Sequence, residues 1–157
     1  PNEPTLEAER LDRMLADVVQ AAQGDQVPEG VRVEMEVAPD LPEVRIDARM
    51  IRQVLLNLVL NGLQAMQRGG TLRIRASLET SGDRWIRIDF ADEGPGVPPE
   101  LAPRIFQPFF TTKATGTGLG LAVVKRFVDA HRGTIDFRSR PGEGTTFTLR
   151  LPVQAGP

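Results

Sequence analysis

Amide side chains recur along one face of a predicted helix in this chain of 157 residues. Gln53, Asn57, Asn61 and Gln64 fall at spacings of four, four and three residues, which places them on one side of a helix. Asparagine is a poor helix former, so its repetition among apolar residues needs a reason. Amide oxygens bind hard cations and polar ligands. A solvated stripe or a buried amide pair also explains the spacing.

A glycine-rich stretch, residues 111–120, leads into an amphipathic segment that ends near residue 133. Gly116, Gly118 and Gly120 let the backbone approach a ligand closely, and a helix N-terminus offers unpaired N–H groups to a phosphate. His131 and Arg132 are expected in the last turn, with Gly133 as the stop signal. A plain turn or hinge is the alternative, because such loops are common.

A third candidate ligand-binding segment is ADEGPG, residues 91–96, which directly follows an alternating strand. An acidic residue at a strand end, followed by Gly94 and Gly96, is a place where ligands meet backbone. An ordinary turn opened by Asp92 competes with this interpretation.

Composition narrows the classes of protein. The chain is 40% hydrophobic and 25% charged, with a net charge of -2 and no cysteine. These values predict one soluble domain with a hydrophobic core. They exclude disulfides and thiolate metal sites, and they give no reason to expect nucleic acid as a partner. No apolar run approaches the roughly 18 residues that a bilayer requires, and no signal peptide is visible.

The elements that must position these residues follow from hydrophobic periodicity. We expect helices over about residues 5–22 and 48–67, the second capped by Asp47. Alternation predicts strands at 31–37 and, more briefly, 44–46, and two hairpins, one of residues 71–77 with 84–90 and one of residues 133–140 with 145–152. The side chains expected on the buried faces of the first hairpin are Leu72, Ile74, Ala76, Ile86, Ile88 and Phe90.

Residues 97–117 show little periodicity apart from a short turn at 99–101. Long irregular loops in compact domains are usually functional or disordered. Phe106, Phe109 and Phe110 fall in this loop, and since aromatic rings avoid water we expect the loop to dock and to move. Together the elements predict an α+β fold, a two-layer sandwich in which helices cover one face of a mixed, mostly antiparallel sheet.

Four separated motifs together resemble one family. QVLLNLVLNGLQAM resembles the N box, DEGPG the first glycine box, IFQPFFTTK the F box and GTGLGLAVVKRFVDAHRG the second glycine box of sensor histidine kinases. GEGTTFTLRLP resembles the closing glycine segment. Order and spacing match over essentially the whole chain, which is similar to the catalytic, ATP-binding domain of these kinases, within the superfamily of gyrase-type, Hsp90-type and mismatch-repair ATPases.

The resemblance implies Mg²⁺ and ATP as cofactors, and a Bergerat-type fold. It implies that Asn61 ligates magnesium through its side-chain oxygen and that Asn57 lies along the phosphates. It further implies that Asp92 accepts a hydrogen bond from the adenine amino group and that Lys113 contacts phosphate. Asn57, Asn61 and Lys113 are the expected catalytic residues. The expected nucleotide-binding residues are Asn57, Asn61, Gln64, Asp92, Gly94, Gly96, Thr112, Lys113, Gly116, Thr117, Gly118, Leu119, Gly120 and Thr145, with Thr146 as the alternative to Thr145.

The expected layout is a linker end at residues 1–4, the catalytic domain at 5–152 with an ATP lid at about 97–117, and a loose tail at 153–157. Three positions depart from the family pattern. Gly62 stands where alanine is common, Glu93 replaces a frequent asparagine, and Gln64 occupies a position where some members carry a lysine. The resemblance therefore does not imply that lysine's contact with the phosphates in this chain.

The resemblance implies transfer of the γ-phosphoryl group to a histidine on a separate dimerisation domain, with a response regulator receiver domain as the further partner. The isolated domain is expected to be a monomer in the cytoplasm, whether or not its parent is membrane-anchored.

In hydrolytic relatives a glutamate stands at the position of Asn57, and an amide cannot act as general base at neutral pH. His131 is better explained by helix capping and the helix dipole than as the phosphate acceptor. A superfamily ATPase, a silent nucleotide-binding module and an anti-sigma-type serine kinase remain alternatives.

Overall fold

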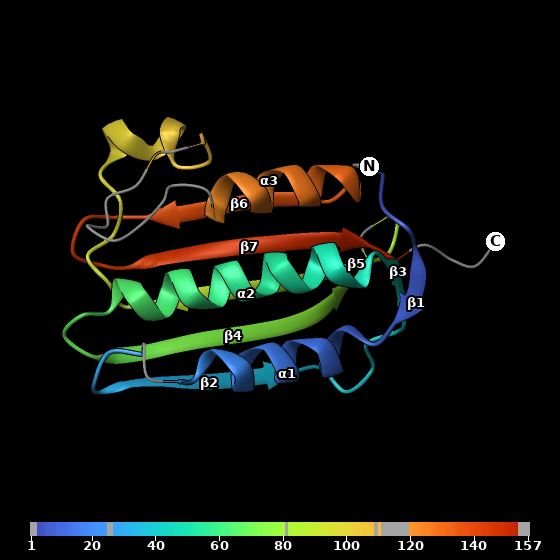
Figure 1. Ribbon diagram of the computed structural model, residues 1–157, viewed down its shortest axis with the longest axis horizontal. Coiled ribbons are helices and arrows are strands. Elements are labelled where there is room, and N and C mark those ends of the chain that lie inside the picture. Colours follow the sequence, from blue (N-terminus) through green and yellow to red (C-terminus); the bar gives the residue numbers. More distant parts are fainter. Residues whose placement is uncertain (1–2, 25–26, 81, 109, 111–119, 154–157) are drawn as a thin grey trace.

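A five-stranded sheet forms one layer of the molecule, and three helices lie across one of its faces (Figure 1). The computed structural model describes residues 3–24, 27–80, 82–108, 110 and 120–153. Its elements are β1 (Glu7–Glu9), α1 (Leu11–Ala22), β2 (Val31–Val37), β3 (Val44–Ile46), α2 (Ala48–Ala65), β4 (Gly70–Glu79), β5 (Trp85–Asp92), the 3-10 helix η1 (Pro99–Arg104), α3 (Gly120–Ala130), β6 (Thr134–Ser139) and β7 (Thr145–Pro152).

The main sheet has the order β2-β4-β5-β7-β6. β2 runs parallel to β4, and the other three pairs are antiparallel. Both predicted hairpins form, β4 with β5 and β6 with β7. The predicted fold class, a two-layer α+β sandwich with a mixed, mostly antiparallel sheet, is confirmed.

The core lies between the sheet and the helices. The six side chains predicted on the buried face of the first hairpin are all buried, and α2 contributes Ile51, Val54, Leu55, Leu58 and Leu63 from its apolar side. Asp47 caps α2 as predicted, because its Oδ1 accepts the N–H groups of Arg49 and Met50 at 3.1 and 3.2 Å. Gly62 brings this helix close to the sheet: a Cβ there would lie 2.7 Å from Cδ1 of Leu72.

The predicted helix over residues 5–22 is wrong at its start. Residues 7–9 form β1, which pairs antiparallel with β3, and α1 begins only at Leu11. The apolar periodicity that predicts this helix also begins at Leu11, so nothing favours helix in the six preceding residues once a partner strand is present. The Arg45 guanidinium reinforces the pairing by donating to the Leu6 carbonyl at 3.2 Å.

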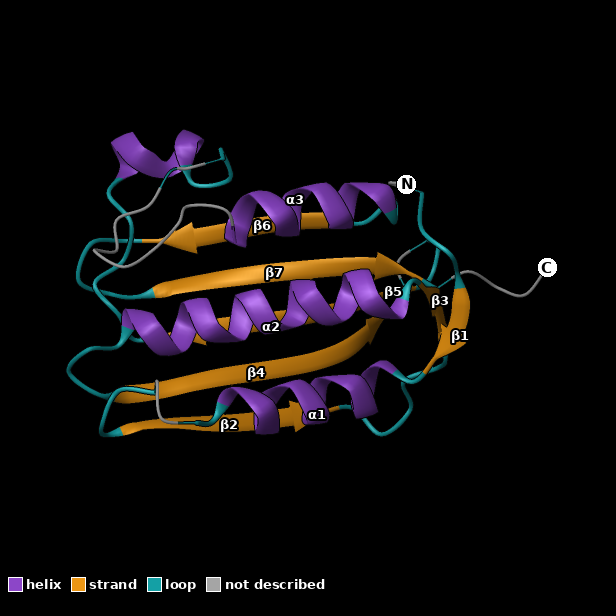
Figure 2. Cartoon of the chain, in the orientation of Figure 1, coloured by secondary structure: helices purple, strands orange, loops and turns teal. Residues whose placement is uncertain are grey.

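Two smaller differences concern ends and edges. α2 ends at Ala65 rather than near residue 67. Met35, which lies on the apolar side of the alternation in β2, is 40% exposed, because β2 is an edge strand. Figure 2 shows the helices α1, α2 and α3 on one face of the sheet. The strands also carry ion pairs, such as Arg150 to Glu79 at 2.9 Å and Arg75 to Glu36 at 3.0 Å. In the described residues no helix combines the length and hydropathy of a membrane span.

Candidate functional site

The amide face of α2 meets the first residue of α3. Asn57 Nδ2 donates to the Gly120 carbonyl at 3.0 Å, and Asn57 Oδ1 accepts from Gln53 Nε2 at 2.7 Å. The predicted row of amides is therefore neither fully solvated nor fully buried: Asn57, Asn61 and Gln64 are all partly exposed. Gly120, the last residue of the glycine-rich stretch, therefore lies against the amide face of α2.

Asp92 ends β5 at the inner side of the sheet and is 7% exposed. Its Oδ1 accepts two backbone N–H groups, from Gly94 at 2.9 Å and from Thr145 at 3.3 Å. Thr145, opposite Asp92 on β7, is also 7% exposed. The carboxylate is thus held by the turn that follows it and by the neighbouring strand.

Ser139 organises the same corner, although no pattern in the sequence points to it. Its hydroxyl accepts the Val97 N–H at 2.6 Å and donates to the Gly144 carbonyl at 3.1 Å. The Thr145 hydroxyl lies 2.9 Å away. A serine in an alternating strand is ordinary, so only its position beside these two turns reveals its role.

Close backbone packing requires both glycines of the Asp92 turn. A Cβ on Gly94 would lie 2.8 Å from the Ala65 carbonyl of α2, and Gly96, at φ +81°, packs against the Arg140 carbonyl. The contact of these glycines with an adenine base, which the resemblance implies, stays a prediction.

Glu93 ties the turn to β4. Its Oε1 accepts the Thr71 N–H at 2.9 Å, and its Oε2 lies 3.3 Å from the Arg73 guanidinium. The hydrogen bond from the Thr71 N–H is the largest cause of the lowered pKa of Glu93, and the Arg73 guanidinium is a smaller one. The glutamate that replaces the frequent asparagine therefore has a structural role here.

The start of the predicted lid docks on the second hairpin. The Phe106 ring makes edge contacts with Phe137 and Phe147, with centroids 6.0 and 6.2 Å apart, and the Arg104 guanidinium lies 5.1 Å from the Phe110 ring centre. The expected short turn here is the longer helix η1. Phe109 lies outside the described residues, as do six predicted site residues: Thr112, Lys113, Gly116, Thr117, Gly118 and Leu119.

Comparison with known proteins decides the family. The family described as histidine kinase-, DNA gyrase B- and HSP90-like ATPase matches residues 46–155. The chain belongs to this ATPase family. It is 39% identical over 153 residues to the sensor histidine kinase ZraS of Escherichia coli (strain K12), covering 98% of this chain and 32% of ZraS. It is 38% identical over 162 residues to the sensory histidine kinase/phosphatase NtrB of Salmonella typhimurium, covering 98% of this chain and 46% of NtrB.

Solved structures of histidine kinases share the fold of this family member. Full-length ShkA in complex with AMPPNP superposes with a TM-score of 0.82 at 28% identity, over 99% of this chain and 33% of that one. The catalytic domain of the histidine kinase ThkA gives a TM-score of 0.77 at 28% identity, over 95% and 96% of the two chains. The resemblance predicted from the four motifs is confirmed. The chain spans about a third to a half of the length of the curated relatives named here.

His131 of this ATPase-family chain has a structural position, as expected, although the reason is partly different. It follows α3 directly and is 4% exposed. Its Nδ1 donates to the Phe127 carbonyl at 2.8 Å, and its Nε2 accepts the Asp47 N–H at 3.0 Å. Because Nε2 accepts, the imidazole is neutral, so the capping role is confirmed but a charge–dipole role does not apply.

The predicted stop signal at Gly133 also differs. Arg132 takes the left-handed conformation, φ 58°, that glycine usually adopts at a helix end. Gly133 instead allows β7 to approach, since a Cβ there would meet the Arg150 carbonyl. The sequence therefore predicts the end of the helix correctly, but the left-handed residue is Arg132 and not Gly133.

Proposed function

We propose that this chain binds Mg-ATP and donates the γ-phosphoryl group to a histidine on a separate dimerisation domain of a longer sensor kinase. A response regulator receiver domain is the subsequent partner. The chain acts in the cytoplasm, where ATP is available, and nucleic acid is not a partner. The catalytic unit comprises residues 5–152.

One observation carries this proposal: α2 contacts both of the motifs that would grip the ends of a nucleotide. Asn57 bonds to Gly120 at the start of α3, and Gly94, in the turn after Asp92, packs against Ala65 near the end of α2. Asn61 lies between these contacts, one helical turn from each. A ligand bound along this helix would therefore have its phosphates near Gly120 and its base near Asp92.

The donor chemistry fits Mg-ATP. Magnesium takes one or two protein oxygens and keeps water and phosphate oxygens as its other ligands, so the Asn61 amide oxygen suffices. In the described part of the chain there is no group of three or more His, Asp or Glu side chains that could hold a metal without a nucleotide. Bound magnesium would neutralise phosphate charge. Asn61 would hold the metal and Asp92 the adenine amino group. The helix start after Gly116 and Gly118, with Lys113, would orient the phosphates.

The state of Asn57 favours transfer over hydrolysis. Its Nδ2 donates to Gly120, and its Oδ1 accepts from Gln53. An amide committed in this way cannot take a proton from water, so this chain has no general base at the position where hydrolytic relatives carry a glutamate. A protein acceptor that supplies its own nucleophile does not need a general base at this position to activate water.

Calorimetric titration with ATP tests the binding half of the proposal. We expect Asn61→Ala to reduce ATP affinity in magnesium to the level measured with a chelator, while cooperative unfolding is retained because alanine favours helix. Arg52→Ala, on the exposed side of the same helix, is the control and should bind as the wild type does. Unchanged affinity of Asn61→Ala in magnesium would exclude the metal role.

Radiolabelled ATP tests the transfer half. The chain is incubated with the histidine-containing domain of its parent, and the product is treated with acid. An acid-labile phosphoprotein supports the proposal. An acid-stable product indicates a serine kinase, and ADP without phosphoprotein indicates an ATPase. Binding with neither product indicates a silent module.

A further inference from the structure

α2 and α3 are joined at both ends of their shared length. At one end Asn57 donates to Gly120, in the proposed nucleotide site. At the other end the Asp47 N–H donates to Nε2 of His131, and Nδ1 of His131 donates to the Phe127 carbonyl. These partners require one neutral tautomer of the imidazole, because a carbonyl only accepts and an N–H only donates. The far-end contact fixes where α3 sits along α2.

The same far end holds the N-terminal segment of the chain. Oδ2 of Asp47 accepts the Thr5 N–H at 2.9 Å, while its Oδ1 caps α2. The Thr5 N–H is the largest cause of the lowered pKa of Asp47. β1 then pairs with β3, the strand that ends one residue before Asp47. Residues 5–9 are therefore joined to the Asp47 cap by a hydrogen bond and by the pairing of β1 with β3.

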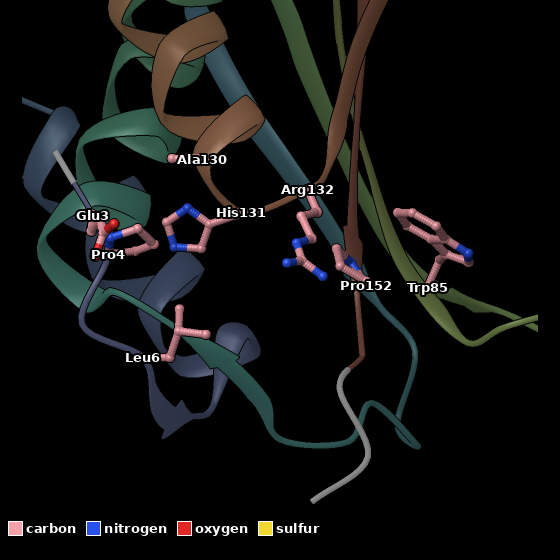
Figure 3. A pocket seen from close by; sticks show the side chains of 8 residues that line it. All are labelled: Glu3, Pro4, Leu6, Trp85, Ala130, His131, Arg132 and Pro152. Atoms are coloured by element: carbon pink, nitrogen blue, oxygen red, sulfur yellow. The ribbon is translucent and has the colours of Figure 1, made fainter. Parts of the chain in front are cut away.

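His131 is buried beside the N-terminal segment. It is 4% exposed, and with Pro4 and Leu6 it lines a hollow of about 600 Å³ against the N-terminal segment (Figure 3). A buried donor or acceptor that loses its partner is costly, so loss of the Asp47 contact favours a shift of α3. Figure 1 shows that β1 and β3 lie at the end of the molecule opposite η1.

We propose that Asp47 and His131 are positioning residues that couple the N-terminal segment to the nucleotide-binding end of α2 and α3. With the far-end contacts made, Gly120 stays within reach of the Asn57 amide. When the N-terminal segment is displaced, α3 shifts along α2 and nucleotide affinity falls. The inference rests on the proposed function for its effect on affinity, but the effect on Asn57 is independent of any nucleotide.

Two matched pairs of variants in this chain test the coupling. His131→Asn keeps a donor for the Phe127 carbonyl and loses the acceptor for the Asp47 N–H, whereas His131→Gln carries an amide oxygen far enough to replace that acceptor. Thr5→Pro removes the backbone N–H that binds Asp47, and Thr5→Ala keeps it. Each variant is measured twice, for Mg-ATP affinity by calorimetry and for the Asn57 side-chain amide signal in a nitrogen–proton NMR spectrum without nucleotide.

We expect His131→Asn and Thr5→Pro to weaken Mg-ATP binding by roughly 2- to 30-fold and to shift the Asn57 signal. His131→Gln and Thr5→Ala should resemble the wild type in both measurements. Wild-type affinity and an unmoved Asn57 signal in Thr5→Pro would overturn the coupling, whatever His131→Asn does. Should His131→Asn fail to unfold cooperatively, the exposed Thr5 pair decides alone. Should the wild type not bind ATP, the proposed function fails, and the Asn57 signal still decides this inference.

Discussion

Asp92 has a structural role and, in the proposed function, would also bind the adenine base. One oxygen, Oδ1, accepts the backbone N–H groups of Gly94 and Thr145. These bonds fix the orientation of the carboxyl group at the end of β5. Because the group is oriented by backbone, its direction does not depend on a ligand, which is the preorganisation that recognition of a base requires.

Asp92→Asn separates these two roles. The amide keeps an oxygen for the backbone N–H groups but presents an amino group in place of the second oxygen. We expect ATP affinity to fall on the order of tenfold, since an unmatched buried hydrogen bond costs about 1–3 kcal/mol, and discrimination between ATP and GTP to shrink. Calorimetry with both nucleotides measures this. Asp89→Asn, on the opposite face of β5, is the control, and equal binding of ATP and GTP by the wild type would contradict the assignment.

Glu93 predicts a pH dependence of stability. Its folded pKa is lowered from 4.5, chiefly by the Thr71 N–H. A lowered carboxyl pKa stabilises the fold fully above the ordinary value and loses that contribution as the pH falls through the folded pKa. The difference in unfolding free energy between wild type and Glu93→Gln should therefore be constant near neutral pH and shrink under acid. Urea unfolding at pH values on both sides of 4.5 tests this. If the difference in unfolding free energy instead grows in acid, Glu93 does not stabilise the fold through its ionised form.

At the scale of elements, the end of α3 is the clearest case of local strain. The Gly133 N–H bonds to the Val128 carbonyl and the Arg132 N–H to the Asp129 carbonyl, both at 3.0 Å. This is the Schellman arrangement, with Arg132 at the left-handed position. A side chain there costs about 1–2 kcal/mol that glycine does not incur.

Substitutions at these two neighbours should have opposite signs. Arg132→Gly relieves the left-handed strain and should stabilise the chain by about 0.5–1 kcal/mol, after the greater chain entropy of glycine is subtracted. Gly133→Ala brings a Cβ against the Arg150 carbonyl and should destabilise it by at least as much. Denaturant unfolding measures both. Arg132→Ala is the control, because alanine keeps the strain, and a stabilising Gly133→Ala would contradict the assignment.

At the scale of the whole molecule, the distribution of charge and apolar surface indicates a chain that stays single. The strands of the sheet carry ion pairs, and exposed pairs of this kind contribute little to stability. Among the described residues, Met35 is the one large hydrophobic side chain that is exposed. The described part of the surface therefore offers little apolar area to a second copy.

Light scattering after size exclusion should therefore give the mass of one chain, 17.2 kDa, at all concentrations. Met35→Glu should leave that mass unchanged. A concentration-dependent dimer in the wild type that Met35→Glu abolishes would instead identify the β2 edge as an interface.

Much of this molecule could be predicted because its signals are local. The alternation in residues 71–90 fixes one face of the first hairpin, and the Asp47 cap is set by bonds to residues two and three positions away. β1 could not be predicted, because residues 7–9 become a strand only through pairing with β3, almost forty residues away along the chain. Tertiary pairing overrides local propensity in such short segments.

The residues of the candidate site also differ in whether a local sequence pattern predicts them. Asn57, Asp92 and Thr145 belong to motifs with fixed spacing, and the structure brings the motifs together on α2. Ser139 and the bond from Asp47 to His131 have no local pattern, because each joins turns or helix ends that are distant in sequence. Such contacts can be read only from the assembled fold.

The position of α1 has a practical consequence for how this domain is delimited. Similarity to the ATPase family begins at residue 46, yet Leu11, Leu15 and Val18 are at most 2% exposed. A fragment cut at the family boundary would expose the apolar side of α2 and remove β2 from the sheet. The helix α1 and the strand β2 thus belong to the folded core, although the family match starts only at residue 46.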